Sequence, residues 1–278
     1  MEQKLKVGVL GATGMVGQRF VTLLENHPWF ELVAVAASPR SAGKTYEEAV
    51  GGRWKMKTPM PEAAKKLVVL NVNQVEEVAA QVDFVFSAVD MSKDEIRAIE
   101  EAYAKAEVPV VSNNSAHRWT PDVPMMVPEL NPEHAEIIPY QRKRLGTKRG
   151  FIAVKPNCSI QSYTPALHAL REFEPTLVVA TTYQAISGAG KTFKDWPEMI
   201  DNVIPYIAGE EEKSEQEPLR IWGKIEDGVI KKAEGPLITT QCIRVPVEDG
   251  HTAAVFVNFK KKPTKEEIID CWNNFSGE

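Results

Sequence analysis

Leu5-Lys-Val-Gly-Val-Leu10-Gly11-Ala-Thr-Gly14-Met-Val-Gly17 is the stretch from which we predict the fold. Residues 5–10 have the pattern of a short buried strand, and residues 18–26 have the spacing of an amphipathic helix. The glycines between them would let the backbone approach a pyrophosphate, whose charge is favoured at the N-terminus of a helix. Because the spacing is GxxGxxG and not the commoner GxGxxG, a plain strand-to-helix turn is the alternative.

Strand-like and helix-like runs continue to alternate through the first half of the chain. The strand-like runs after the first one are residues 31–37, 67–70, 83–89 and 108–112. This alternation predicts a Rossmann-type, doubly wound parallel sheet of α/β class. The second half has more strands and fewer such units, so we expect a nucleotide-binding domain over 1–150 and an α+β catalytic and dimerisation domain over 151–278.

The end of the second predicted strand bears on the choice of cofactor. NAD-binding sites often carry an acidic residue there, which binds the ribose 2′-hydroxyl. Here the chain has Ser38, Arg40 and Ser41, whose hydroxyl and guanidinium groups suit a 2′-phosphate. We therefore expect NADP, with NAD possible, although a solvated turn has the same composition. Ser87 and Asn114 lie where two later strands end, which is where parallel sheets bind their ligands.

Cys158 is the candidate nucleophile. It follows an apolar run and Lys155-Pro-Asn157, and precedes a segment that we predict to be helical to about residue 173. A thiol at a helix N-terminus is favoured as the reactive thiolate. The alternative is a small buried hydrophobic residue, as free cysteines usually are.

His251 is the candidate partner of Cys158, because it alone among the five histidines follows a glycine turn between two predicted strands. A Cys/His pair would supply a nucleophile and an acid or base, and such pairs are often distant in sequence. A single histidine is more often structural. Cys242 and Cys271 have the pattern of packing residues.

Composition excludes several classes of protein. The net charge is -5, and basic residues cluster only at 142–144 and 260–262, so we expect no nucleic-acid partner. No apolar run reaches the roughly 18 residues of a membrane span, and the N-terminus lacks the pattern of a signal peptide. Three widely separated cysteines indicate a reducing compartment and no zinc site, so we expect a cytoplasmic protein without a metal.

In these motifs the chain resembles the aspartate-β-semialdehyde dehydrogenases, in particular their archaeal and fungal-type branch, and the resemblance covers essentially all 278 residues. The matching motifs are residues 11–17, 112–118, 156–159, Gln184 before 187–190, Glu210 with Lys213, and 244–251. The resemblance implies NADPH-dependent reduction of L-aspartyl-4-phosphate to L-aspartate 4-semialdehyde and phosphate, through a cysteine thioacyl intermediate. In the family this step is shared by lysine, threonine and methionine biosynthesis.

The resemblance also implies a role for each matching residue. Cys158 would be the nucleophile, His251 the acid or base, and Gln184 the residue that orients the acyl group. Arg244 would bind the substrate α-carboxylate and Glu210 its α-ammonium group, while Arg118, Asn157 and Lys213 would bind the phosphate. Without the resemblance, residues 210–217 read as a solvated acidic helix face. We expect cofactor contacts at Gly11, Thr13, Gly14, Met15, Val16, Ser38, Arg40, Ser41, Ser87, Asn114, Ser187 and Gly188.

The resemblance implies a homodimer or homotetramer. Members of the family usually continue for several tens of residues beyond the position of Glu278, so the catalytic domain is expected to be short at its C-terminus. Two alternatives stay open. One is a sister enzyme, either an N-acetyl-γ-glutamyl-phosphate reductase or a malonyl-CoA reductase. The other is a truncated, non-catalytic nucleotide-binding protein.

Overall fold

The computed structural model describes residues 3–277, which form two compact units. Unit 1 contains the chain up to Pro124 together with Glu136–Lys155, and unit 2 contains Met125–Ala135 together with the chain from Pro156 onward. The chain therefore passes between the units more than once, and not only near residue 150. Residues 152–154 pair with the sheet of unit 1, whereas Val127 and Leu130 pack in the core of unit 2.

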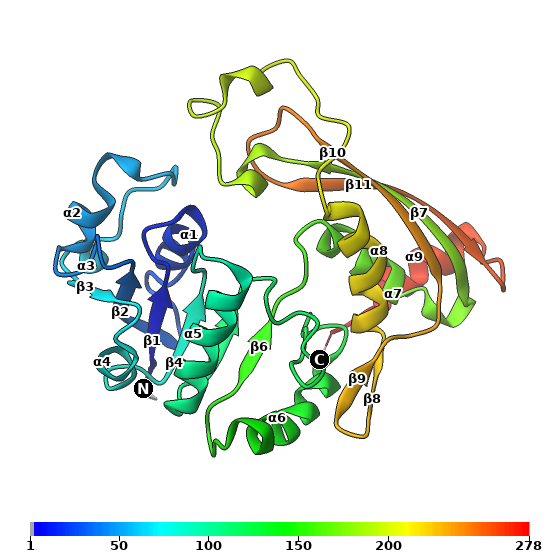
Figure 1. The fold of residues 1–278 in the computed structure, drawn as a ribbon. Coiled ribbons are helices and arrows are strands. Elements are labelled where there is room, and N and C mark those ends of the chain that lie inside the picture. Colours follow the sequence, from blue (N-terminus) through cyan, green and yellow to red (C-terminus); the bar gives the residue numbers. More distant parts are fainter. Residues whose placement is uncertain (1–2, 278) are drawn as a thin grey trace. The chain divides into compact units, whose positions relative to one another are not determined.

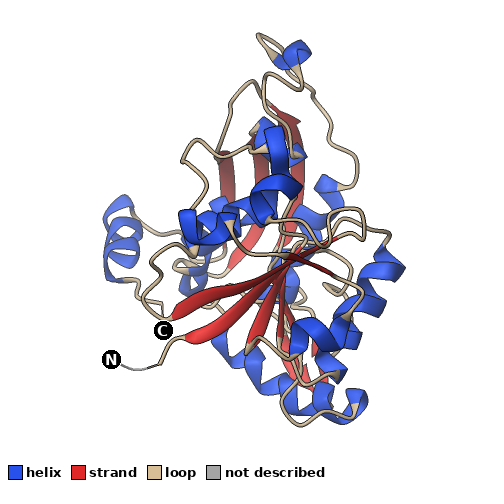
Figure 2. Ribbon diagram, turned by 90° about the vertical axis from the view of Figure 1, so that its left-hand side faces the viewer, coloured by secondary structure: helices blue, strands red, loops and turns tan. Residues whose placement is uncertain are grey.

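Unit 1 contains a six-stranded parallel sheet in the order β3-β2-β1-β4-β5-β6. Its strands are β1 (Leu5–Leu10), β2 (Phe30–Ala37), β3 (Val69–Asn71), β4 (Phe84–Ser87), β5 (Val110–Ser112) and β6 (Ile152–Val154). Its helices are α1 (Met15–Leu23), α2 (Tyr46–Val50), α3 (Glu62–Lys65), α4 (Val75–Ala79), α5 (Lys93–Lys105) and α6 (Ile138–Leu145). Figure 1 shows these helices flanking the sheet, and Figure 2 shows its strands fanning out with a twist. The predicted doubly wound fold is confirmed.

The glycine-rich turn lies where the strand order of this sheet reverses, between β1 and β4. Gly11 follows β1 with a φ of +78°, and a Cβ there would lie 2.2 Å from the carbonyl oxygen of Ala88, just beyond β4. A Cβ on Gly17 would lie 2.2 Å from the Gly11 carbonyl oxygen. Both positions therefore accept only glycine. Parallel sheets bind their ligands at this reversal, outside the carboxyl ends of the strands.

The first helix begins three residues earlier than we predicted. We expected residues 18–26, whereas α1 spans Met15–Leu23. Gly14 has an extended conformation and forms the N-cap, so the helix starts directly after it. Asn26 has a φ of 53°, which no α-helix contains. The shift places Met15 and Val16 in the first turn of α1, next to the glycine-rich turn.

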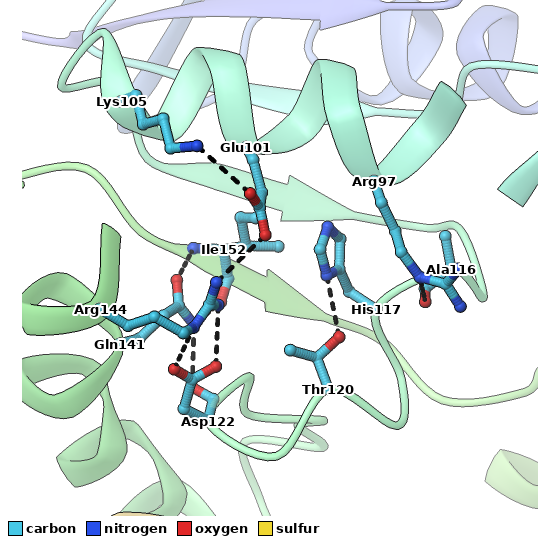
Figure 3. A network of polar contacts seen from close by, with 10 residues as sticks. All are labelled: Arg97, Glu101, Lys105, Ala116, His117, Thr120, Asp122, Gln141, Arg144 and Ile152. Atoms are coloured by element: carbon cyan, nitrogen blue, oxygen red, sulfur yellow. Dashed lines mark hydrogen bonds and ion pairs between the residues drawn. The ribbon is translucent and has the colours of Figure 1, made fainter. Parts of the chain in front are cut away.

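A polar network holds the connection that follows β5, residues 113–124, against α5 and α6 (Figure 3). Arg144 binds both carboxylate oxygens of Asp122, at 2.5 and 2.9 Å, and also contacts Glu101 at 3.1 Å. The Gln141 amide donates to the carbonyl oxygens of Asp122 and Ile152, both at 2.9 Å. The pair of bonds from Arg144 to Asp122 is the bidentate, and therefore strong, form of an arginine–carboxylate contact. The network therefore holds in place the connection that carries Arg118.

Unit 2 is built on the three-stranded sheet β10-β7-β11. β7 (Pro175–Gln184) is central, parallel to β10 (Leu237–Arg244) and antiparallel to β11 (His251–Phe259). Its helices are α7 (Thr164–His168), α8 (Glu210–Ile221) and α9 (Lys265–Asn274), and β8 (Lys224–Glu226) pairs with β9 (Val229–Lys231). Every second residue of β7 and β10, from Val178 and Ile238 on, is buried. Figure 1 shows α8 beside this sheet, and the second unit has the expected mixed α and β content.

The segment after Cys158 is not the continuous helix that we predicted to about residue 173. It consists of a 3₁₀ turn at Ile160–Ser162, then α7, then a second 3₁₀ turn at Arg171–Phe173. Tyr163, with φ of -131°, and Pro165 interrupt the helical hydrogen bonds. No long helix therefore begins at Cys158 and directs its dipole at the thiol. None of the helices within residues 3–277 is long and apolar enough to cross a membrane.

The carboxylate of Glu107 holds the backbone of residues 148–150 in unit 1, and this contact depends on pH. Its carboxylate accepts hydrogen bonds from the backbone N–H groups of Lys148, Arg149 and Gly150, which lower the pKa of Glu107 to about 2. Since the pKa in the unfolded chain is 4.5, this stabilisation is complete above pH 4.5 and is lost as the pH falls toward about 2. We predict that Glu107→Gln lowers the melting temperature near neutral pH and that the difference from wild type shrinks below pH 4.5. The measurement is thermal unfolding across this pH range, with the exposed Glu25→Gln as control. A difference in melting temperature between Glu107→Gln and wild type that stays constant with pH would contradict the prediction.

Candidate functional site

The nucleophile turn, defined here as Asn157, Cys158 and Ser159, lies shortly after β6 and leads into the 3₁₀ turn Ile160–Ser162. The Oδ1 atom of Asn157 accepts hydrogen bonds from both the backbone N–H and the hydroxyl of Ser159, each at 2.8 Å. An asparagine that bonds the residue two positions on forms an Asx turn. Asn157 and Ser159 are buried, and Cys158 between them is exposed. The turn therefore presents one reactive side chain, held on both sides by buried neighbours.

His251, the first residue of β11, lies next to Cys158. Its Nε2 atom is 3.2 Å from Cys158 Sγ, although the two residues are 93 positions apart in the chain. The Ala185 backbone N–H donates to His251 Nδ1 at 3.0 Å. Because Nδ1 accepts this bond, the proton of the neutral ring lies on Nε2 and can be donated to the sulfur. The antiparallel pairing of His251 with Gln184, beside Ala185, sets this arrangement.

Glu210, the first residue of α8, is the carboxylate of the site. It accepts hydrogen bonds from Asn157 Nδ2 and Lys213 Nζ, both at 2.7 Å. Burial raises the pKa of Glu210, but the bonds from Lys213, Asn157 and Gln184 outweigh burial and hold it below its usual value. Glu210 is therefore a stable anion. The side chains predicted to act in catalysis or to bind substrate at positions 157, 184, 210 and 213 thus meet at one carboxylate.

Arg244, at the end of β10, brings a cation to the same place. Its guanidinium is buried and Nη1 donates to the Ala185 carbonyl oxygen at 2.6 Å. Burial lowers the pKa of Arg244, and the charges of Glu210 and of a Cys158 thiolate oppose that shift. An arginine keeps its charge despite such a shift. Its proximity to Cys158, together with the Nε2 proton of His251, can stabilise a thiolate without a helix dipole.

Ser187 and Gly188 lie in the 3₁₀ turn Ile186–Ala189, which follows β7. A Cβ on Gly188 would lie 2.9 Å from Arg244 Nη1 and 3.0 Å from His251 Cε1. The backbone therefore passes directly over both side chains. A side chain at position 188 would therefore require the Arg244 guanidinium and the His251 ring to shift.

In unit 1, the glycine-rich turn is held by two buried side chains. The Tyr46 hydroxyl donates to the Ala12 carbonyl oxygen at 2.8 Å, and burial raises the pKa of that hydroxyl. Gln18 Nε2 donates to the carbonyl oxygens of Thr13 and Arg53, both at 3.0 Å. The turn between Gly11 and the first turn of α1 is thus preorganised. Beyond β2, Ser38 and Arg40 are exposed and Ser41 is buried.

Glu100 is a residue of unit 1 that our reading of the sequence missed. It is buried on α5, and its Oε1 accepts hydrogen bonds from Ser112 Oγ at 2.6 Å and Asn114 Nδ2 at 2.9 Å. Asn114 Nδ2 also donates to Ser87 Oγ at 3.2 Å. One predicted cofactor residue, Asn114, therefore binds this carboxylate and connects it to a second one, Ser87. The sequence pattern that could have revealed Glu100 is its helical spacing from Ile96 and Tyr103, which places it on the buried face of α5.

Arg118 lies in unit 1, apart in sequence from the other predicted phosphate ligands. Its Nε donates to the Lys155 carbonyl oxygen at 3.0 Å.

Within residues 3–277 no cluster of His, Cys, Asp and Glu side chains could hold a metal ion.

Two family models match the chain: semialdehyde dehydrogenase, NAD binding domain, over residues 6–138, and semialdehyde dehydrogenase, dimerisation domain, over residues 166–278. The aspartate-semialdehyde dehydrogenase of Methanothermobacter thermautotrophicus is 40% identical over 274 residues, covering 98% of this chain and 76% of that protein. The chain belongs to the aspartate-semialdehyde dehydrogenase family. The resemblance that we inferred from the motifs is thereby confirmed.

Fungal members of the family are equally similar. The aspartate-semialdehyde dehydrogenase of Aspergillus fumigatus is 41% identical, over 99% of this chain and 76% of that protein. The crystal structure of the Candida albicans enzyme with NADP superposes with a TM-score of 0.84 at 36% identity, over 99% of this chain and 77% of that one. This chain thus spans about three quarters of the length of these relatives.

The close approach of Gly188 generates a prediction. Gly188→Ala forces Arg244 and His251 away from their positions, so the hydrogen bond between His251 and Cys158 is lost or lengthened. A hydrogen bond to a charged group contributes about 1.5–3 kcal/mol, which corresponds to about tenfold or more in the rate of a reaction that depends on it. Alkylation of Cys158 by iodoacetamide, followed by mass spectrometry, should slow by that factor. Gly52→Ala, where a Cβ meets nothing within 4 Å, is the matched control; equal rates in both variants would contradict the prediction.

Proposed function

We propose that this protein reduces L-aspartyl-4-phosphate to L-aspartate 4-semialdehyde and phosphate, with NADPH as reductant. The observation that carries the proposal is the 3.2 Å contact between Cys158 Sγ and His251 Nε2, beside the partly buried Glu210 and the buried Arg244. Family membership supports it. The proposal includes a cytoplasmic location and a part in lysine, threonine and methionine biosynthesis, both of which rest on the family alone.

The chemistry begins at Cys158. The thiolate forms a bond to the acyl carbon, the bond from that carbon to the phosphate oxygen breaks, and phosphate leaves with the electron pair. When bound, NADPH supplies the hydride that reduces the thioacyl carbon. Breaking the carbon–sulfur bond then releases the aldehyde and restores the thiolate. His251 Nε2 holds the proton that stabilises the thiolate before attack and after release.

The charges of the site match those of an aspartyl group. Arg244 binds the α-carboxylate, Glu210 binds the α-ammonium group, and Gln184 orients the acyl group. In the structure Glu210 is paired with Lys213 and Asn157. Binding of the substrate ammonium replaces part of this pairing and frees Lys213 and Asn157 for the phosphate. Arg118 is assigned to the phosphate by family resemblance.

The features of unit 1 fit a dinucleotide. A glycine-rich turn with no room for side chains at Gly11 and Gly17 is what close backbone approach to a pyrophosphate requires. Ser38 and Arg40 would bind the 2′-phosphate of NADP, and Ser87 and Asn114 would bind nearer the reacting end. The contacts expected at Thr13, Met15, Val16, Ser41, Ser187 and Gly188 belong to the same proposal.

The sister reductases fit the site less well. Malonyl-CoA has no ammonium group, and N-acetyl-γ-glutamyl phosphate carries a neutral amide in its place. Either substrate would leave the partly buried Glu210 anion without the partner that displaces Lys213, at an electrostatic cost. A non-catalytic nucleotide-binding protein has no need of the Cys158–His251 pair.

The first test of the function is phosphate-dependent reduction of NADP⁺ by L-aspartate 4-semialdehyde, run in parallel with NAD⁺. We expect turnover that requires phosphate and favours NADP⁺. Cys158→Ala should abolish it, because no other group can form the thioacyl bond, while Cys271→Ala should retain it. Turnover by Cys158→Ala, or turnover of malonyl-CoA in place of the semialdehyde, would refute the proposal.

We also propose that the protein is a homodimer formed through the outer face of the β10-β7-β11 sheet. Leu237 and Phe256 on that face are 69% and 60% exposed. Phe256 pairs with Val179, which is 38% exposed, so the apolar side chains adjoin. Exposed apolar patches of this kind mark protein interfaces. The match of residues 166–278 to a dimerisation domain makes a second copy the expected occupant.

A charge on this face should prevent association. We predict that Phe256→Glu shifts the protein from dimer to monomer in sedimentation velocity, because a carboxylate in an apolar interface has no partner. Leu23→Glu, at a 63% exposed apolar position of unit 1, should leave the dimer intact. A dimer that survives Phe256→Glu would exclude this face.

A further inference from the structure

Three polar side chains on one face of α8 contact the nucleophile turn. Glu210 bonds the side chain of Asn157 at 2.7 Å, Ser214 Oγ lies 3.2 Å from Ser159 Oγ, and Glu217 bonds the backbone N–H of Asn157. These positions are spaced i, i+4 and i+7, which places them along one side of a helix. Glu210 has a place in the proposed reaction, but Glu217 has none.

Glu217 is fully buried, which calls for an explanation. Its relative exposure is 0%, and Oε2 accepts the Asn157 N–H across 60 residues of sequence in a short hydrogen bond. Removing a carboxylate from water is unfavourable, and a hydrophobic residue of similar size is often no worse for stability. A bond from a backbone N–H to a carboxylate is shorter and about twice as strong as one between neutral groups. The carboxylate thus provides a stronger hold on the turn than a neutral side chain could.

The consequence falls on Cys158. The carboxylate holds the N–H before the cysteine, and Asn157 Oδ1 holds the N–H after it. Gln161 Nε2 also donates to the Asn157 carbonyl oxygen, at 3.2 Å. With both flanking peptides held, the direction of the Cys158 side chain is set, and with it the contact to His251.

We propose that Glu217 is a positioning residue for Cys158: by holding the Asn157 N–H it directs Sγ toward His251 Nε2. Glu217 touches no reacting atom, and its effect on Cys158 is transmitted by the hydrogen bond to the Asn157 N–H. The proposal rests on the proposed function only where turnover is measured, since the reactivity of the thiol can be followed without substrate.

Three substitutions separate the parts of this role. Glu217→Asp keeps the charge but withdraws it by one methylene, so the bond to Asn157 is lost or lengthened. Glu217→Gln removes the charge but keeps a carbonyl oxygen that can accept the same bond. Glu215→Asp is the matched control, because Glu215 lies on the same helix and its Oε1 accepts a backbone N–H at 3.0 Å, but from Thr240 on β10.

We expect Glu217→Asp to slow iodoacetamide alkylation of Cys158 and to lower kcat by about 10- to 100-fold, as small misplacements of catalytic groups do. The KM for the semialdehyde should change little, because Arg244 and Glu210 keep their positions. Glu217→Gln keeps an acceptor but makes a weaker bond, so its alkylation rate and kcat should lie between those of wild type and of Glu217→Asp, and Glu215→Asp should alter neither. A purely structural role predicts lower melting temperatures in the Glu217→Asp and Glu215→Asp variants without a selective loss of thiol reactivity, and that result would overturn the proposal.

A measurement on the wild-type protein tests the proposal without any variant. A hydrogen bond to a buried carboxylate should move the amide proton of Asn157 downfield in the NMR spectrum and slow its exchange with solvent. An ordinary shift with fast exchange would overturn the proposal even if the Glu217 variants failed to fold. Wild-type protein without dehydrogenase activity, but with the expected differences in alkylation and in the Asn157 signal, would refute the proposed function and leave the positioning role standing.

Discussion

The hold of α8 on the turn around Cys158 is the interaction on which the candidate site depends. Two of its carboxylates, Glu210 and Glu217, bind the side chain and the backbone of the same residue, Asn157. Removing either carboxylate from water is unfavourable, and each is stabilised by hydrogen bonds that an apolar environment could not supply. Because these bonds hold the turn, the one exposed side chain in it faces His251 and lies near Arg244.

The same device recurs in unit 1. There Glu100 on α5 holds Ser112, the last residue of β5, and Asn114 just beyond it, as Glu217 holds Asn157 beyond β6. In both places a strand ends in polar residues whose conformations no regular ladder determines. A carboxylate from a neighbouring helix supplies the missing partner for their N–H and hydroxyl groups. Polar turns at strand ends are thus held by buried charge, and the glycine-rich turn is held by the neutral side chains of Tyr46 and Gln18.

The reactive cysteine owes its setting to tertiary contacts and not to a helix. Tyr163 and Pro165 break the segment behind it into short pieces, so few peptide dipoles are aligned. The groups that can stabilise negative charge on the sulfur are the Nε2 proton of His251 and the buried guanidinium of Arg244. The Ala185 N–H selects the ring tautomer, and the Ala185 carbonyl oxygen holds the guanidinium, so one residue after β7 orients both groups.

The sequence by itself determined the doubly wound sheet, the strands carrying Gln184 and Arg244, and the glycine-rich turn, because these depend on local period and on residues that only certain turns accept. It also singled out Cys158 and His251. Only the tertiary structure decided that Glu100 and Glu217 are buried and bonded, because a glutamate in a charged run has the same local pattern whether water or a distant backbone faces it. It also decided where the chain passes between the units and why the helix after Cys158 breaks. The physical reason is one of range: propensity and period act over a few residues, whereas Asn157 meets Glu217 across sixty residues of sequence and only after the chain has folded.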